Sequence, residues 1–180
     1  MDYNGAMQAD VAVFRALNGL VGSGGLLDAL VIFCARFLPY IAILVVIWHL
    51  WLKRRDIFSL LDQGFAVFAP AILSCFVFTQ ILKEIIARPR PFMSLPGVHL
   101  LVNIDGFAFP SAHAAFFFAL GLAMFYLDKA FGKRILVIAV VISVARVVAG
   151  VHYPLDILGG AVLGLLVAYF VNLWSQRSLQ

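Results

Sequence analysis

The sequence contains very little charge for its length. Only 12% of its 180 residues are Asp, Glu, Lys or Arg, whereas an average soluble domain has about 25%. Hydrophobic residues make up 64% of the chain, and the mean hydropathy is +1.03. A soluble protein of 19.8 kDa leaves much of its surface in water and could not hide this much apolar surface. The composition therefore excludes a disordered chain and a basic domain with nucleic acid as its partner, and it indicates a membrane protein.

Cysteine is scarce as well. Cys34 and Cys75 both lie in apolar runs, and the sequence has no CxxC motif and no paired-ligand spacing. Both residues are therefore interpreted as small buried hydrophobic side chains, and no redox pair or metal site is expected. The first ten residues lack a basic region and include Asp2 and Asp10, so a cleaved signal peptide is not expected either.

Long apolar segments dominate the rest of the chain. Five are long enough to cross a bilayer as helices, at about residues 26–51, 57–82, 111–127, 135–151 and 157–174. Before them, residues 8–20 carry apolar side chains at helical spacing, which favours an amphipathic helix at the interface, although an ordinary packed helix fits the same pattern. The predicted fold is an all-α integral membrane bundle of about five transmembrane helices, with six as the alternative, plus this N-terminal helix.

Charged residues divide into two groups along this topology. Residues 92–110 are rich in turn formers and form the longest expected loop. The opposite side of the bundle carries seven of the 13 basic residues: Lys53, Arg54, Arg55, Lys129, Lys133, Arg134 and Arg177. The positive-inside rule places that side in the cytoplasm and the 92–110 loop outside it, in a multi-pass protein of the plasma membrane. Residues 1–180 are expected to form one domain, with a motif core in 57–175.

Polar residues at membrane level gather on the extracytoplasmic side. They are Lys83 and Arg90 after the second segment, Ser111, Ala112 and His113 at the start of the third, and Arg146, His152 and Asp156 between the fourth and fifth. Three cations with few nearby carboxylates are costly beside a bilayer unless an anion joins them, and phosphate suits both the Arg fork and the Lys point charge. The helix that starts after Pro110 adds N–H groups, and Ser111 can cap that helix or donate its hydroxyl to a phosphate.

Two histidines add reactive groups to this predicted phosphate site. Asp156 follows His152 by four residues, so its carboxylate can hold one ring nitrogen and leave the other as a nucleophile. His113 comes from another segment and can protonate the leaving oxygen. These are the parts that phosphoryl transfer to histidine requires. Taken singly, Arg146 could instead pair with Asp62, and Lys83 could be an interfacial lysine.

The three segments resemble the signature of the type 2 phosphatidic acid phosphatase (PAP2) superfamily, which also includes vanadium haloperoxidases. The family pattern is K-x6-R-P, then P-S-G-H, then S-R-x5-H-x3-D. This chain has Lys83-x6-Arg90-Pro91, Pro110-Ser111-Ala112-His113 and Arg146-x5-His152-x3-Asp156. Ala112 replaces the usual Gly but keeps a backbone N–H. Ala145 replaces the Ser before Arg146, which removes one hydroxyl and puts the substrate preference in doubt.

The resemblance implies a PAP2/haloperoxidase-like helical core and a lipid phosphatase that needs no metal and no cofactor. His152 would attack phosphorus to form a phosphohistidine, and His113 would protonate the leaving group and then activate water. The phosphoryl oxygens would be bound by Lys83, Arg90, Ser111, Ala112 and Arg146. The expected partners are a lipid phosphate substrate and membrane lipids.

The small size of the chain and its expected orientation in the membrane narrow the choice of substrate. Small family members with this orientation resemble bacterial undecaprenyl-diphosphate phosphatases, which act in cell-wall biogenesis. Phosphatidylglycerophosphate, phosphatidic acid and lipid A phosphatases share the motif and stay as alternatives. An anion transporter would spread its charges across the spans, whereas here they gather at one level. An inactive scaffold would lack one of the predicted catalytic residues, and all are present. Haloperoxidases are larger and soluble, so all three alternatives are disfavoured.

Overall fold

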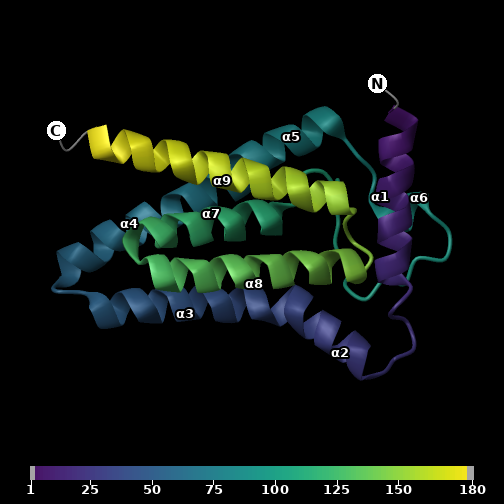
Figure 1. Ribbon diagram of the computed structural model, residues 1–180, viewed down its shortest axis with the longest axis horizontal. Helices are drawn as coiled ribbons and strands as arrows, with labels where there is room; N and C mark the ends of the chain where they lie inside the picture. Colours follow the sequence, from purple (N-terminus) through teal and green to yellow (C-terminus); the bar gives the residue numbers. More distant parts are fainter. Residues whose placement is uncertain (1–2, 178–180) are drawn as a thin grey trace.

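The computed structural model describes residues 3–177, and this part of the chain contains helices and no strands. In chain order the elements are α1 (Tyr3–Asn18), α2 (Leu26–Ile32), η1 (Phe33–Phe37), α3 (Leu38–Lys53), α4 (Ile57–Ile72), η2 (Leu73–Phe78), α5 (Thr79–Ile86), α6 (Pro91–Ser94), α7 (Ala112–Leu127), α8 (Lys129–Val148) and α9 (Pro154–Arg177). The short π-helical elements η1 and η2 continue directly into their neighbours. The predicted all-α bundle is confirmed, and its long helices run side by side while α1 crosses one end (Figure 1).

Several helix boundaries differ from the predicted ones because side chains cap the helices beyond the apolar runs. The fourth segment begins at Lys129 rather than near 135, since the Asp128 carboxylate accepts a hydrogen bond from the Phe131 N–H at 3.0 Å. The second segment continues to Ile86, and the short helix α6 occupies the start of the predicted 92–110 loop. Apolar content located the helices, whereas capping set their ends.

Helix α7 is the centre of the bundle. It contacts α8, α9 and α4, and its buried residues lie all round the helix rather than on one stripe. A helix with no polar face belongs in an interior, where every side can pack. The core around it includes Leu120 and Met124 from α7, Val46 from α3 and Ile135 and Ile142 from α8. The motif residues at the start of α7 are therefore fixed on a rigid support.

Glycines allow α7 and α9 to pack closely. A Cβ atom at Gly160 would lie 2.4 Å from the Ser111 carbonyl oxygen, and one at Gly164 would lie 2.2 Å from the Ala115 carbonyl oxygen. No side chain fits in these spaces, so small residues are required for the two backbones to meet. These glycines let the start of α9 pack directly against the start of α7.

Large apolar side chains cover the outside of the bundle. Trp48, Phe58, Phe65, Leu158 and Phe170 are among many that are more than half exposed. Water does not support such a surface, whereas lipid does. Three helices in the described part of the chain are long and apolar enough to cross a membrane, at Leu26–Lys53, Ile57–Ser94 and Pro154–Ser175. The protein is therefore a multi-pass membrane protein.

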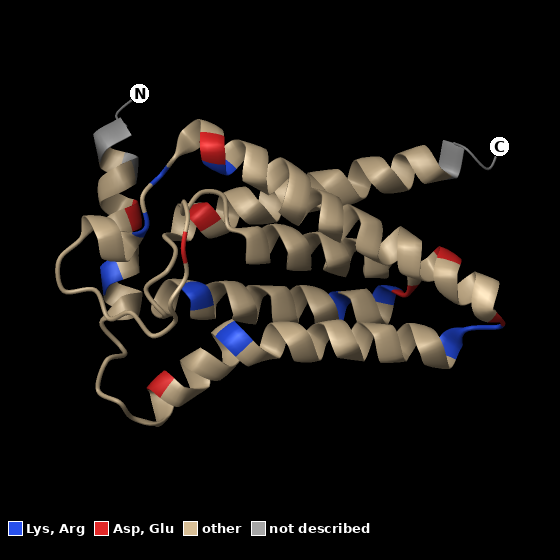
Figure 2. Ribbon diagram, turned by 180° about the vertical axis from the view of Figure 1, so that it is seen from behind, with Lys and Arg blue, Asp and Glu red and all other residues tan. Residues whose placement is uncertain are grey.

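The charged residues gather towards the two ends of the bundle (Figure 2). At the end away from α1, the α3–α4 link and the α7–α8 turn meet, and Asp128 accepts from the Lys53 ammonium and lies 3.3 Å from the His49 ring. At the other end, α1, the segment after α5, the start of α7 and the α8–α9 turn come together (Figure 1). All the motif residues belong to this second end or to the helices that lead into it.

Candidate active site

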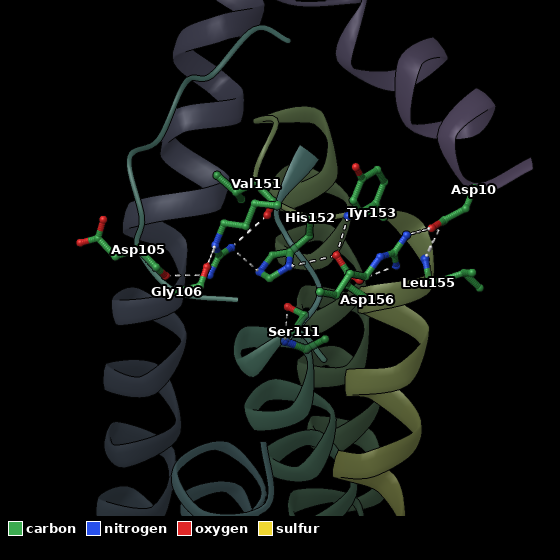
Figure 3. A network of polar contacts seen from close by, with 12 residues as sticks. Asp10, Asp105, Gly106, Ser111, Val151, His152, Tyr153, Leu155 and Asp156 are labelled. Carbon is green, nitrogen blue, oxygen red and sulfur yellow. Dashed lines mark hydrogen bonds and ion pairs between the residues drawn. The ribbon is translucent and has the colours of Figure 1, made fainter. Parts of the chain in front are cut away.

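His152 and Asp156 form the centre of the site. His152 is 1% exposed in the turn between α8 and α9, and Asp156 is fully buried in the first turn of α9. The Asp156 Oδ2 atom lies 3.5 Å from His152 Nδ1 and accepts a hydrogen bond from the Tyr153 N–H at 2.8 Å. The other ring nitrogen, Nε2, faces the Arg90 guanidinium at 3.5 Å (Figure 3). The predicted pairing of Asp156 with one ring nitrogen stays a prediction, because 3.5 Å is an ion-pair separation and Nδ1 has no hydrogen-bond partner among residues 3–177.

The environment of His152 keeps its imidazole neutral. Burial lowers the pKa of His152 well below its usual value, and the positive charges of Arg146, Arg90 and Lys83 lower it further. A neutral ring has a lone pair on one nitrogen, which is the form that a nucleophile requires.

Ser111 joins the start of α7 to the start of α9. Its hydroxyl accepts a hydrogen bond from the Ala114 N–H at 3.4 Å, which makes Ser111 the N-cap of α7, and its own N–H donates to the Asp156 carbonyl at 2.9 Å. Of the two roles considered for the Ser111 hydroxyl, the structure shows the capping role. Ala112 and His113 follow in the first turn of α7, where the helix dipole favours an anion.

Arg90 is engaged mainly with the backbone. Its guanidinium donates to the carbonyl oxygens of Gly106 at 2.7 Å, Val151 at 2.9 Å and Asp105 at 3.0 Å. The side chain is completely buried, and it holds the 105–106 loop beside His152 (Figure 3). The motif predicted that Arg90 binds phosphoryl oxygens, but nothing in the sequence predicted its hydrogen bonds to these three backbone carbonyls.

Arg146, in contrast to Arg90, has few hydrogen-bond partners among the described residues. It is 2% exposed near the end of α8, and its Nη1 atom makes one long hydrogen bond of 3.4 Å to the Ala35 carbonyl. That carbonyl lacks its usual helical donor because Pro39 has no N–H. Within the described residues, the Nε and Nη2 atoms of Arg146 have no hydrogen-bond partner. The alternative pairing of Arg146 with Asp62 is therefore wrong.

A pocket of about 450 Å³ opens beside these residues, between α3, the η2–α5 segment and α7. Its polar end is lined by Lys83, Arg90 and His113, together with Ala112. Its other end is apolar, with Tyr40, Ile43, Phe76, Phe116 and Phe117. The pocket thus combines a cationic end and a hydrocarbon-like end, the two properties of a phosphorylated lipid.

Arg88 lies between the motif residues Lys83 and Arg90 and binds two carboxylates. Its Nη1 atom donates to Asp156 Oδ1 at 2.7 Å and its Nη2 atom donates to Asp10 Oδ2 at 2.6 Å. The guanidinium also packs over the Tyr153 ring, 4.1 Å from its centroid. Asp10 lies in the N-terminal helix α1, is 5% exposed and is buried in this contact. Within residues 3–177, no three His, Cys, Asp or Glu side chains are grouped as a metal site.

An apolar helical bundle that carries a buried histidine–carboxylate pair and a cationic lipid-sized pocket defines a membrane-embedded lipid phosphatase. The model of the PAP2 superfamily matches residues 60–180. The chain belongs to the PAP2 superfamily, as its three motifs predicted.

The chain is also similar to two curated relatives, and one solved structure shares its fold. The chain is 34% identical over 178 residues to the bacitracin transport permease protein BcrC of Bacillus licheniformis, covering 96% of this chain and 83% of that one. It is 25% identical over 159 residues to the undecaprenyl-diphosphatase BcrC of Bacillus subtilis, covering 87% and 79%. The crystal structure of LpxE from Aquifex aeolicus has a similar fold, with a TM-score of 0.74 at 24% identity over 89% of this chain and 93% of that one.

Proposed function

We propose that this protein removes a phosphate group from a membrane lipid diphosphate on the extracytoplasmic face, and that undecaprenyl diphosphate is its substrate. The observation that carries the proposal is the buried Arg146 guanidinium, whose Nε and Nη2 atoms have no partner among the described residues. A buried cation without an anion is costly, so the site fits an anionic substrate better than it fits the empty state. The adjoining apolar end of the pocket suits the lipid tail.

The proposed reaction has two steps. In the first, His152 Nε2 attacks phosphorus, a P–N bond forms, the P–O bond to the leaving group breaks, and the leaving oxygen takes a proton from His113. In the second, His113 takes a proton from water, the water oxygen attacks phosphorus, and the P–N bond breaks to release phosphate and His152. Asp156 stabilises the imidazole while it carries charge. Arg146 and Lys83 bind the phosphoryl oxygens, where charge develops.

Orientation follows from the basic residues at the opposite end of the bundle. Lys53, Arg54 and Arg55 lie at the α3–α4 link, and Lys129, Lys133 and Arg134 lie at the start of α8. The positive-inside rule makes this end cytoplasmic if five segments cross the membrane, namely α2–α3, α4–α5, α7, α8 and α9. The site end, with α1 across it at the interface, then faces the extracytoplasmic side.

The choice of lipid rests on the relatives. One is an undecaprenyl-diphosphatase, and the solved structure of LpxE supports the fold alone. Another relative is named a transport permease. Transport of an anion requires polar groups along the whole path, whereas α7 at the centre of this bundle is apolar from Ala114 to Leu127. Hydrolysis at one end agrees better with this distribution.

A phosphate-release assay in detergent tests the proposal. The panel contains undecaprenyl diphosphate, phosphatidylglycerophosphate, phosphatidic acid and lipid A, each with wild type and with His152→Ala. We expect the highest kcat/KM for undecaprenyl diphosphate, activity that persists in EDTA, inhibition by vanadate, and no activity in a folded His152→Ala protein. Activity that survives in His152→Ala contradicts the nucleophile assignment. Preference for another lipid on the panel contradicts the substrate assignment.

A further inference from the structure

The carboxylate that orients His152 is itself held by a second ion pair that reaches the N-terminal helix. Arg88 divides its guanidinium between two carboxylates, with one nitrogen on Asp156 Oδ1 and the other on Asp10 Oδ2. The side chains of Asp10 and Asp156 are 1% and 0% exposed, and that of Arg88 is 17% exposed. Such a partly buried, charge-assisted network is stronger and more geometrically defined than a surface ion pair.

Each member of the network is fixed from a different part of the chain. Asp10 comes from the middle of α1, and its Oδ1 atom accepts a hydrogen bond from the Leu155 N–H at 2.9 Å, in the first turn of α9. Arg88 lies in the extended segment between α5 and α6 and stacks on the Tyr153 ring. Phe14, one turn after Asp10 on α1, packs against the same ring, with centroids 5.4 Å apart. The network therefore joins α1 to the turn that carries His152 (Figure 3).

Because Arg88 binds two carboxylates, it contacts only one oxygen of Asp156 and leaves the other oxygen available to His152. An arginine opposite a single carboxylate tends to bind both of its oxygens in a bidentate pair. Here Asp10 takes one of the two Arg88 nitrogens, so Asp156 Oδ1 alone is bound to Arg88. Asp156 Oδ2 stays with the Tyr153 N–H and His152 Nδ1.

We propose that Asp10 and Arg88 are positioning residues for the nucleophile, which act through Asp156 to set the orientation and tautomer of His152. Helix α1 is then part of the active-site assembly, and not only a membrane-surface element. The proposal rests on the proposed function, since it assumes that His152 is the nucleophile. It assigns no contact with substrate to either residue.

Asp10→Asn is the sharpest variant. The amide is nearly the same size and its oxygen can still accept from the Leu155 N–H, but it no longer balances the charge of Arg88. Arg88 is then free to bind both oxygens of Asp156 and to draw Oδ2 away from His152. We expect kcat to fall by about 10–100-fold, the size found when outer partners of an active-site group are removed. KM should change less than about twofold, because Lys83 and Arg146 remain in place.

Asp28→Asn is the matched control. Asp28 is also a buried aspartate at this end of the bundle, 6% exposed, and its carboxylate accepts from the N–H groups of Gly22 and Gly24. It has no contact with Arg88, Asp156 or His152 among the hydrogen bonds and ion pairs of residues 3–177. We expect Asp28→Asn to lower Tm while kcat per folded protein stays unchanged. If Asp10→Asn behaves in the same way, its role is only structural and the proposal is overturned.

Arg88→Lys provides an independent arm. Lysine keeps the positive charge but lacks the planar fork that spans two carboxylates. The proposal expects a kcat loss like that of Asp10→Asn, and wild-type kcat in this variant would overturn it. In an Asp156→Asn background, Asp10→Asn should cause little further loss, because residues that act through one another are not additive. Full additivity of the two losses would likewise overturn it.

A spectroscopic measurement separates this inference from the proposed function. In 15N-histidine-labelled protein in detergent micelles, the Nδ1 and Nε2 shifts of His152, assigned with His152→Gln, report the tautomer without any turnover. We expect Asp10→Asn to change these shifts and Asp28→Asn to leave them unchanged. Unchanged His152 shifts in Asp10→Asn would refute the positioning role even in an active enzyme. A wild type that hydrolyses no lipid on the panel refutes the proposed function, while the shifts still test the positioning.

Discussion

Replacing Arg146 with methionine should change activity and stability in opposite directions. The guanidinium is 2% exposed, and its Nε and Nη2 atoms are free of partners in the described part of the chain. Each can donate a charge-assisted hydrogen bond to a phosphoryl oxygen, and a bond of that kind contributes about 1.5–3 kcal/mol. Two such bonds correspond to about 3–6 kcal/mol, so we expect kcat/KM to fall by roughly 10²–10⁴-fold in Arg146→Met.

The same substitution should not harm the folded protein. In the absence of substrate, Arg146 is a desolvated cation whose only hydrogen bond within residues 3–177 is the long one to the Ala35 carbonyl. Exchange of buried charges for apolar side chains of similar volume is often neutral or stabilising, by about 1–4 kcal/mol. We therefore expect the Tm of Arg146→Met, measured by scanning calorimetry in detergent, to equal or exceed that of the wild type.

Ligand binding provides the decisive comparison. Phosphate or vanadate should raise the Tm of the wild type, because a ligand that binds only the folded state stabilises it. Arg146→Met should lose most of this rise. Arg36→Met is the matched control, since Arg36 is an exposed arginine beside Ala35, and it should keep both activity and the ligand-dependent rise. An Arg146→Met protein that unfolds at a much lower temperature, or that keeps its phosphate response, would refute the reasoning.

Two further predictions concern protonation and packing. Since the pKa of His152 lies well below its usual value of about 6.5, the unfolded chain takes up a proton near that pH while the folded protein does not. The free energy of unfolding, from denaturant titrations at several pH values, should therefore decrease as the pH falls below about 6.5, and His152→Gln should reduce this slope. Gly164→Val places side-chain atoms against the Ala115 carbonyl and should destabilise the fold by at least about 1–3 kcal/mol. Gly64→Ala, which meets open space within a helix, should be neutral or stabilising.

The sequence predicted those features of the site that depend on the spacing of residues within one segment. His152 and Asp156 are four residues apart at the start of a helix, so local geometry alone brings them together. Ser111 precedes the first residue of α7, so its capping role was among the expected ones. The glycines of the last segment are a local signal of close helix packing, and the structure shows that α7 is the partner.

The partners of buried polar groups could not be predicted in this way. Arg88 and Asp10 are 78 residues apart, and no local pattern links them. Helical spacing predicted the N-terminal helix but left open whether it lies at the interface or packs in the bundle, and the structure shows that Asp10 and Asn18 face protein. Asn18 hydrogen-bonds the carbonyls of His99 and Val148, and Asp10 binds Arg88. Hydrophobic periodicity identifies a helix, whereas the buried face also depends on donors and acceptors supplied by the rest of the fold.

The Asp10–Arg88–Asp156 network also accounts for the charge of the pocket. Asp156 is a buried carboxylate close enough to Arg90 to be affected by its charge, and Arg88 binds it, so it cannot fully neutralise the cations of the pocket. The network carries one net negative charge, whereas Lys83, Arg90 and Arg146 carry three positive charges, and the histidine nucleophile is neutral. Asp105 also lines the pocket, but it is exposed and its side chain is directed away from His152 (Figure 3), so water weakens its effect on the buried cations. The buried part of the site therefore keeps a net positive charge, which favours the binding of a terminal phosphate dianion. A phosphodiester carries only one negative charge, so we expect the site to bind ordinary phospholipids less well than a lipid with a terminal phosphate.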